Sequence, residues 1–185
     1  MERIENAALE LFAHHGYGHT SISQIAKAAG ISKGLMYNYY ESKKALLLAI
    51  VRKGFEMGNA MNTNGIEEIP SEPMLFLRFF VETTFQQVQE HFHYFRLLAS
   101  LSFQEDVMAE IKPEIDRQKE QLLSMGTEMF RQLGHPEPME QALLFAASMD
   151  GVFFHYAISP DDYPLERMKL RLMDNFCKKY SSPHL

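Results

Sequence analysis

Side chains able to bind DNA are concentrated between Thr20 and Lys43, in the segment TSISQIAKAAGISKGLMYNYYESK. Its hydroxyl, amide, phenol and ammonium groups are donors of the kind that bind phosphate oxygens and base edges. The second half of the segment is expected to form a helix too short to be stable alone. A purely structural helix of that length is not expected to expose Leu35, two tyrosines and Lys33 together, so the pattern predicts an intermolecular contact.

The same segment carries start and stop signals for two short helices. Ser21 and Gln24 have the spacing of a capping box, and Ser32 can cap a second helix. Gly30 lies where the first helix must end and the chain must reverse, which glycine permits most easily. A third start follows at Ser42. Helix, short turn and helix together predict a helix-turn-helix, whose second helix lies in the DNA major groove.

The charge distribution supports a DNA contact for the N-terminal part only. Residues 1–53 contain seven Lys or Arg and four Glu, a balance of +3, whereas the remaining 132 residues contain eleven basic and twenty acidic residues, a balance of −9. The whole chain therefore carries −6 although its N-terminal part is basic. This asymmetry predicts a polyanionic partner for the N-terminal part.

The N-terminal part resembles the DNA-binding domain of the tetracycline-repressor (TetR) family of bacterial transcriptional regulators. Two positions depart from the family's usual pattern: Leu35 stands where a small Thr or Ala is frequent, and Tyr40 where Phe is usual. Leu35 could alter the base contacted, through a thymine methyl, and Tyr40 should change little. The resemblance is carried by Ile4, Ala7, Ala8, Leu11, Phe12, Gly16, Thr20, Ser21, Ile25, Ala26, Ala29, Gly30, Ser32, Lys33, Gly34, Tyr37, Tyr39, Ser42, Lys43 and Leu46.

The resemblance implies a homodimer that binds a palindromic double-stranded operator, most often as a repressor. Thr20, Tyr37 and Lys43 are then expected to hold phosphates, and Lys33 and Leu35 to touch base edges with Asn38 or Tyr39. Gly34 is expected to let the backbone come close to the DNA. The full set of predicted DNA-binding residues is Thr20, Ser21, Ser32, Lys33, Gly34, Leu35, Tyr37, Asn38, Tyr39 and Lys43.

The rest of the chain also has a helical pattern, which predicts an all-α protein. We expect a helix-turn-helix domain at residues 1–46 and a larger helical effector-binding and dimerisation domain at 47–185. A linker is predicted at 59–73, and Pro113 predicts a helix start or kink near residue 112. Helices are predicted at about 2–15, from Ser42 to about 61, and at 74–91, 92–103, 106–134, 137–158 and 164–180.

Several classes of protein are excluded or disfavoured. The single cysteine, Cys177, rules out an intramolecular disulfide and a cysteine-cluster zinc site. No apolar run approaches the roughly 20 residues that cross a bilayer, and no signal-peptide pattern is present, so a cytoplasmic protein with no membrane partner is expected. No phosphate loop, nucleophile elbow or HExxH motif occurs. We therefore expect no enzyme activity, no cofactor and no metal site.

The C-terminal part is rich in Phe and Met, which fits either a packed core or an apolar cavity between helices. Regulators of the family that the chain resembles bind a small effector in this part. We therefore expect a small hydrophobic or aromatic effector, with His91 as one further candidate polar contact. The predicted ligand-binding residues are Phe80, Thr83, Thr84, Phe95, Gln118, Met125, Met129, Met149 and Phe153.

The last two predicted helices are apolar over more than one face, which predicts partial burial against a second copy. The alternative is a buried terminal helix in a monomer. Asp150 lies in one of these helices, and an effector contact, a helix–helix hydrogen bond or a pair with His155 all remain open for it. The predicted dimer interface comprises Leu143, Ala147, Phe154, Leu165, Met168, Leu172 and Phe176.

Together these patterns predict a one-component transcriptional regulator that an effector releases from DNA. An alternative is a helical module that binds a protein partner, with no regulatory effector and with the helix-turn-helix idle. Retained DNA binding with a strong salt dependence would distinguish the first from the second.

Overall fold

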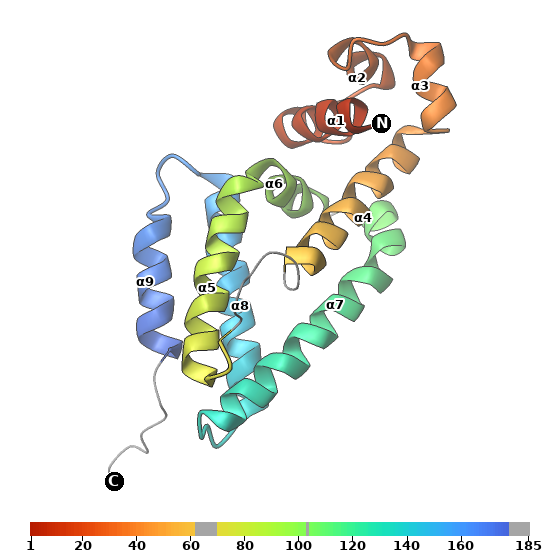
Figure 1. Cartoon of the computed structure of the whole chain (residues 1–185). Coiled ribbons are helices and arrows are strands. Elements are labelled where there is room, and N and C mark those ends of the chain that lie inside the picture. Colours follow the sequence, from red (N-terminus) through yellow and green to blue (C-terminus); the bar gives the residue numbers. More distant parts are fainter. Residues whose placement is uncertain (62–69, 103, 178–185) are drawn as a thin grey trace. The chain divides into compact units, whose positions relative to one another are not determined.

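The computed structural model describes residues 1–61, 70–102 and 104–177. Within these ranges the chain consists of nine α-helices and no β-strand, which confirms the predicted all-α class (Figure 1). The helices are α1 (Glu2–His15), α2 (Ile22–Ala28), α3 (Lys33–Tyr39), α4 (Lys43–Met61), α5 (Pro73–Glu90), α6 (Phe92–Leu101), α7 (Glu105–Gln132), α8 (Pro138–Ile158) and α9 (Leu165–Phe176).

Most helix bounds agree with the sequence prediction, and local signals account for several of them. Gly16 ends α1 with φ 81°, and Ser42 caps α4 by accepting a hydrogen bond from the Ala45 amide at 3.0 Å. Of the two alternatives predicted near residue 112, the helix start is wrong, because α7 begins at Glu105 and continues through Pro113, and the kink stays a prediction. Most of the predicted linker, residues 62–69, lies outside the described residues.

Contacts group the helices into two compact units, which do not follow chain order. The first unit comprises Met1–Ile66 with His91–Lys112, and the second comprises Glu67–Glu90 with Pro113–Leu185. The helix α6 therefore belongs with the N-terminal helices, and it packs against α1 and α4. The sequence predicts a boundary after residue 46 between a DNA-binding domain and an effector-binding and dimerisation domain, and this boundary stays a prediction.

The first unit is held by an apolar stripe of α1 and by a close crossing of α4 and α6. Ile4, Ala8 and Phe12 are buried, as their helical spacing predicts. A Cβ atom at Gly54 of α4 would lie only 2.0 Å from Cζ of Tyr94 in α6. The Tyr94 hydroxyl donates a hydrogen bond to the Val51 carbonyl of α4 at 3.1 Å. Glycine at position 54 is therefore what lets the Tyr94 ring lie against the backbone of α4.

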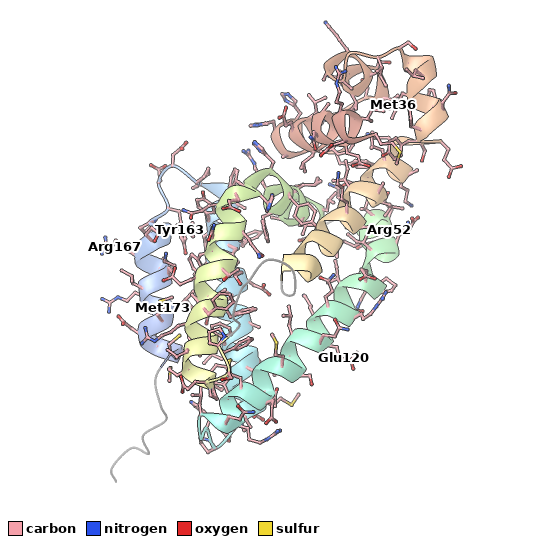
Figure 2. The ribbon with its side chains drawn as sticks, viewed as in Figure 1. Met36, Arg52, Glu120, Tyr163, Arg167 and Met173 are labelled. Carbon is pink, nitrogen blue, oxygen red and sulfur yellow. The ribbon has the colours of Figure 1, made fainter. Side chains whose placement is uncertain are left out.

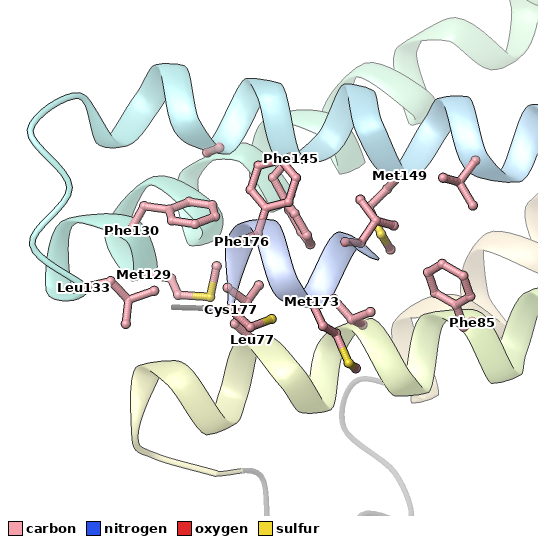
Figure 3. Packing of buried hydrophobic residues seen from close by; sticks show 14 of the residues in the cluster. Leu77, Phe85, Met129, Phe130, Leu133, Phe145, Met149, Met173, Phe176 and Cys177 are labelled. Carbon is pink, nitrogen blue, oxygen red and sulfur yellow. The ribbon is translucent and has the colours of Figure 1, made fainter. Parts of the chain in front are cut away.

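The second unit has one apolar core, to which α5, α7, α8 and α9 all contribute (Figure 3). Phe145 of α8 makes edge-on ring contacts with Phe130 of α7 at 6.0 Å and with Phe176 of α9 at 5.2 Å. Such contacts fix the face that each helix turns inward. Across the described ranges, none of the helices combines the length and the apolarity that a membrane crossing requires.

Candidate nucleic-acid interface

The helix-turn-helix is present with the capping that the sequence predicts. Ser21 accepts a hydrogen bond from the Gln24 amide at 3.3 Å, and the Gln24 side chain accepts one from the Ser21 amide at 2.7 Å, which completes the capping box. Gly30 has φ 70° in the turn. Ser32 caps α3 by accepting a hydrogen bond from the Leu35 amide at 3.1 Å. The two sets of local bonds determine where α2 and α3 begin, and Gly30 permits the turn between them.

The short helix α3 exposes nearly all of its surface. Its one buried residue is Met36, which is fully inaccessible to solvent (Figure 2). Leu35, Tyr37 and Tyr39 are exposed by 40%, 48% and 48%, so three large side chains are exposed together on one short helix. Lys33, Gly34 and Asn38 are exposed as well. A surface with large apolar bodies, phenol groups and one ammonium suits a partner that offers both phosphates and base edges.

Gly34 leaves open space on this surface. A Cβ atom built there would meet only the Ser32 hydroxyl oxygen, at 4.0 Å. The α3 backbone can therefore approach a groove closely at this position, as the sequence predicts for it.

Two predicted phosphate contacts have side chains that are engaged within the first unit. Thr20 is buried, and its hydroxyl donates to the Gly16 carbonyl at 2.9 Å. The Lys43 ammonium donates to the carbonyls of Tyr17 and Thr20 at 2.8 and 2.9 Å and lies over the Tyr17 ring. Thr20 thus fastens the loop between α1 and α2 to the end of α1, and Lys43 fastens the same loop to the start of α4. Their role toward DNA remains a prediction, whereas the exposed side chains of α3 are placed to make contacts.

Tyr40 has a larger role than its sequence position suggests. Its hydroxyl donates to one carboxylate oxygen of Glu5 at 2.7 Å, and Lys53 donates to the other oxygen at 2.8 Å. Burial alone would raise the pKa of Glu5, but hydrogen bonds from Lys53 and Tyr40 hold it below its usual value. Burial, together with the bond to Glu5, raises the pKa of Tyr40. The expectation that tyrosine instead of phenylalanine changes little is therefore wrong for the contacts inside this unit.

The predicted ligand-binding residues are distributed over both units. Met129 and Met149 belong to the buried core of the second unit, and Phe80 and Phe153 pack against that core. Met125 is exposed by 40%, and the Thr84 hydroxyl donates to the Phe80 carbonyl at 2.7 Å. Thr83 is half-buried on α5, and Phe95 lies on α6 in the first unit.

Gln118 is the polar member of that set with the clearest signal. Its Nε2 atom is buried and has no hydrogen-bond partner among the described residues. A buried amide without a partner is uncommon because it costs free energy, so this donor is available to a molecule bound beside it. Two hollows also open on the surface of the second unit, one between Glu120 and Met139 and one over α9 at Pro164–Asp174. Neither hollow is lined by a predicted ligand residue.

The predicted dimer residues divide into exposed and buried sets. On α8, Leu143 and Phe154 are exposed by 48% and 38%, and Ala147 is exposed too. Met168 of α9 is half-buried. A correction applies to the rest of α9, since Leu165, Leu172 and Phe176 lie in the core of their own unit and cannot form a free outer face. The predicted dimer set leaves out four exposed large apolar residues of α8 and α9, which are Met139, Leu144, Ile158 and Leu170.

Near this face, His155 stacks on the Tyr163 ring at 6.0 Å. Burial raises the pKa of Asp150, and the positive charge of Lys119 opposes that rise. A role for Asp150 as an effector contact, in a helix–helix hydrogen bond or in a pair with His155 stays a prediction.

Comparisons with known proteins agree with the fold and with the helix-turn-helix. Residues 4–50 match the profile of the family described as bacterial regulatory proteins, tetR family. The uncharacterized HTH-type transcriptional regulator YuxN of Bacillus subtilis (strain 168) is 52% identical over 48 residues, which are 26% of this chain and 16% of YuxN. The chain thus spans well under half the length of that relative.

Two solved structures share the fold over nearly the whole chain. One is a transcriptional regulator from Saccharomonospora viridis in complex with choline, with a TM-score of 0.81, 18% identity and coverage of 94% of this chain and 93% of that one. The other is FadR from Bacillus subtilis in complex with stearoyl-CoA, with a TM-score of 0.78, 16% identity and coverage of 97% and 99%. At these identities the likeness establishes the fold alone. Through residues 4–50, the chain belongs to the tetR family of bacterial regulatory proteins.

Proposed function

We propose that the protein is a one-component transcriptional regulator, most simply a cytoplasmic repressor, that places α3 in the major groove of its operator. The observation that carries this proposal is the exposure of Leu35, Tyr37 and Tyr39 on a helix that buries only Met36. Ser21, Ser32, Lys33, Gly34 and Asn38 complete the exposed contact surface. Thr20 and Lys43 support it from within through their hydrogen bonds to the loop after α1.

The regulator acts as a homodimer on a palindromic site whose half-sites lie about one helical turn apart. Support comes from the exposed apolar residues of α8, namely Leu143, Leu144, Phe154 and Ile158. Exposed apolar surface of this kind marks protein–protein contacts, and a two-fold axis would let each copy cover the face of the other.

Binding to selected duplex DNA tests the regulatory function. A random pool of double-stranded oligonucleotides is passed over the full chain, and the retained sequences are read. A palindromic consensus is expected, with affinity for it falling steeply as salt rises, because each released counterion contributes to the slope. A dimer that contacts about six phosphates should give a slope near −5 in log K against log salt.

No enrichment over the starting pool, together with a flat salt dependence, would reject DNA binding. That result would favour the alternative, a helical module that binds a protein partner.

The effector of this regulator is a small, largely hydrophobic molecule held in the second unit. Phe80, Phe153 and Met149 supply the apolar surroundings. The Gln118 amide, which has no hydrogen-bond partner within the described part of the chain, supplies a donor. Choline and stearoyl-CoA in the two solved structures are ligands with apolar or weakly hydrated groups, which fits a site of this kind. The ligand would act by binding the two states of the regulator with different affinity.

If Gln118 is the polar contact of the effector, Gln118→Leu should raise the stability of the free protein and weaken ligand binding. Without ligand the variant should unfold at a higher temperature, because a buried amide without a partner costs about 1–3 kcal/mol. With ligand the variant should lose the stabilisation that the wild type gains, which is about 2.7 kcal/mol at a ligand concentration 100 times Kd. Thermal unfolding with long-chain acyl, quaternary ammonium and aromatic compounds measures both effects.

Gln121→Leu, at an exposed position of the same helix, is the matched control and should change neither quantity. If Gln118→Leu lowers stability and leaves ligand stabilisation intact, Gln118 is not the polar contact.

A further inference from the structure

One buried carboxylate joins three separate elements of the first unit. Glu5 lies in the first turns of α1, is only 9% exposed, and uses both of its oxygens. Oε1 accepts from the Tyr40 hydroxyl at 2.7 Å, and Oε2 accepts from the Lys53 ammonium at 2.8 Å. Tyr40 follows α3 directly, and Lys53 lies ten residues after Lys43, where α4 begins. The carboxylate thus connects α1 with the end of α3 and with the middle of α4.

The geometry restricts how α3 can tilt. Tyr40 has an extended backbone, with φ −139° and ψ 117°, and its position determines where the chain leaves α3 for α4. Burying a carboxylate is unfavourable unless both oxygens are satisfied. Any rotation of α3 that withdraws the Tyr40 hydroxyl therefore leaves a buried charge without one of its partners. The result is a strong preference for one inclination of α3 relative to α1 and α4.

We infer that Glu5 is a positioning residue for DNA binding, which holds α3 at the inclination that the major groove requires without touching DNA itself. The inference rests on the proposed function. Glu5, Tyr40 and Lys53, which the two hydrogen bonds join, are called the clasp below. The clasp acts on affinity for every duplex sequence alike, because it places the reading helix but contacts no base.

For Glu5→Gln, the change in charge and the change in the orientation of α3 should alter DNA affinity in opposite directions. Removing a carboxylate from a DNA-binding unit reduces repulsion by phosphates, so charge alone would strengthen binding. Loss of the clasp would weaken DNA binding, because α3 would sample orientations that do not fit the groove. Only the molecules with α3 in the fitting orientation would bind. Glu10→Gln is the matched control, since Glu10 is an exposed carboxylate of the same helix.

The experiment measures the Kd of each variant for the operator obtained by selection and for an unrelated duplex of equal length. Circular dichroism and thermal unfolding verify that each variant is folded at the assay temperature. We expect Glu5→Gln to weaken binding to both duplexes about tenfold, in keeping with the loss of a charge-assisted hydrogen bond. Glu10→Gln should bind as well as the wild type or more tightly.

Tyr40→Phe tests the same clasp without changing any charge and with almost no change in volume. It should weaken binding to both duplexes severalfold. The double variant Glu5→Gln with Tyr40→Phe should be little worse than Glu5→Gln alone, because a neutral amide has one acceptor oxygen for two donors, so both substitutions weaken the same interaction. Lys53→Arg, which keeps a cationic donor, should retain most of the wild-type affinity.

Each outcome separates this inference from the proposed function. If the wild type binds its operator and folded Glu5→Gln and Tyr40→Phe bind equally well or better, Glu5 only stabilises the fold and the inference is wrong. If both variants change the preferred sequence rather than the affinity for all duplexes, the clasp does not act through position alone, which also overturns it. If the wild type binds no duplex, the proposed function fails first.

Discussion

A variant with aspartate in place of both Leu143 and Phe154 should be a monomer at micromolar concentration and should lose about a hundredfold or more in operator affinity. Both residues are exposed apolar side chains of α8, by 48% and 38%. In the proposed dimer they are covered by the second copy, where a carboxylate would be left buried without a partner. In a dimer, binding of one helix-turn-helix raises the effective concentration of the other at its half-site, which increases affinity. A monomer lacks this gain. Sedimentation equilibrium and titration of the palindromic duplex measure the two effects.

Leu75→Asp provides the control for this prediction. Leu75 is exposed by 55% but lies on α5, outside the proposed interface, so its replacement should leave both the mass and the affinity unchanged. A double aspartate variant that sediments as a dimer would show that α8 is not the contact surface.

Leu35→Ala is expected to change which sequence the protein prefers. The Leu35 side chain is 40% exposed on α3 and offers methyl groups that could pack against a thymine methyl. Loss of that contact should cost about 1–3 kcal/mol at one base pair of each half-site and little at the others. Repeating the selection from random duplexes with the variant, and titrating single-base substitutions of the wild-type site, measures the change.

Tyr37→Phe is the matched comparison for Leu35→Ala. It removes only a hydroxyl predicted to donate to phosphate, so it should weaken binding to all sequences by a similar factor and leave the consensus unchanged. Equal losses for every sequence with Leu35→Ala, or an altered consensus with Tyr37→Phe, would contradict the roles assigned to these two side chains.

Local interactions made the helix-turn-helix predictable from the sequence. The Ser21–Gln24 and Ser32–Leu35 bonds join residues three apart, so residue type and spacing alone reveal them. Gly30 could be identified for the same reason, since its positive φ is a property of one residue. The exposure of α3 also followed from its own composition, because only one of its large apolar side chains is needed to anchor so short a helix.

The sequence also determined that the chain is all-α and where most helices begin and end. It could not determine which apolar residues of α9 turn inward, because apolar side chains occur on more than one face of that helix. Only the packing of α9 on α5 and α8 decided this, and it buried Leu165, Leu172 and Phe176 in the core of their own unit.

Long-range partners were likewise decided by tertiary structure alone. Glu5 meets Tyr40 and Lys53 across 35 and 48 positions of the chain, and Lys43 meets the carbonyls of Tyr17 and Thr20 across 26 and 23. No local pattern records such pairs, because they exist only once α1 and α4 have packed together. The sequence by itself therefore determined the helices of the helix-turn-helix and its exposed surface. The tertiary structure determined which polar side chains are exposed and can reach DNA, and which form hydrogen bonds within the first unit.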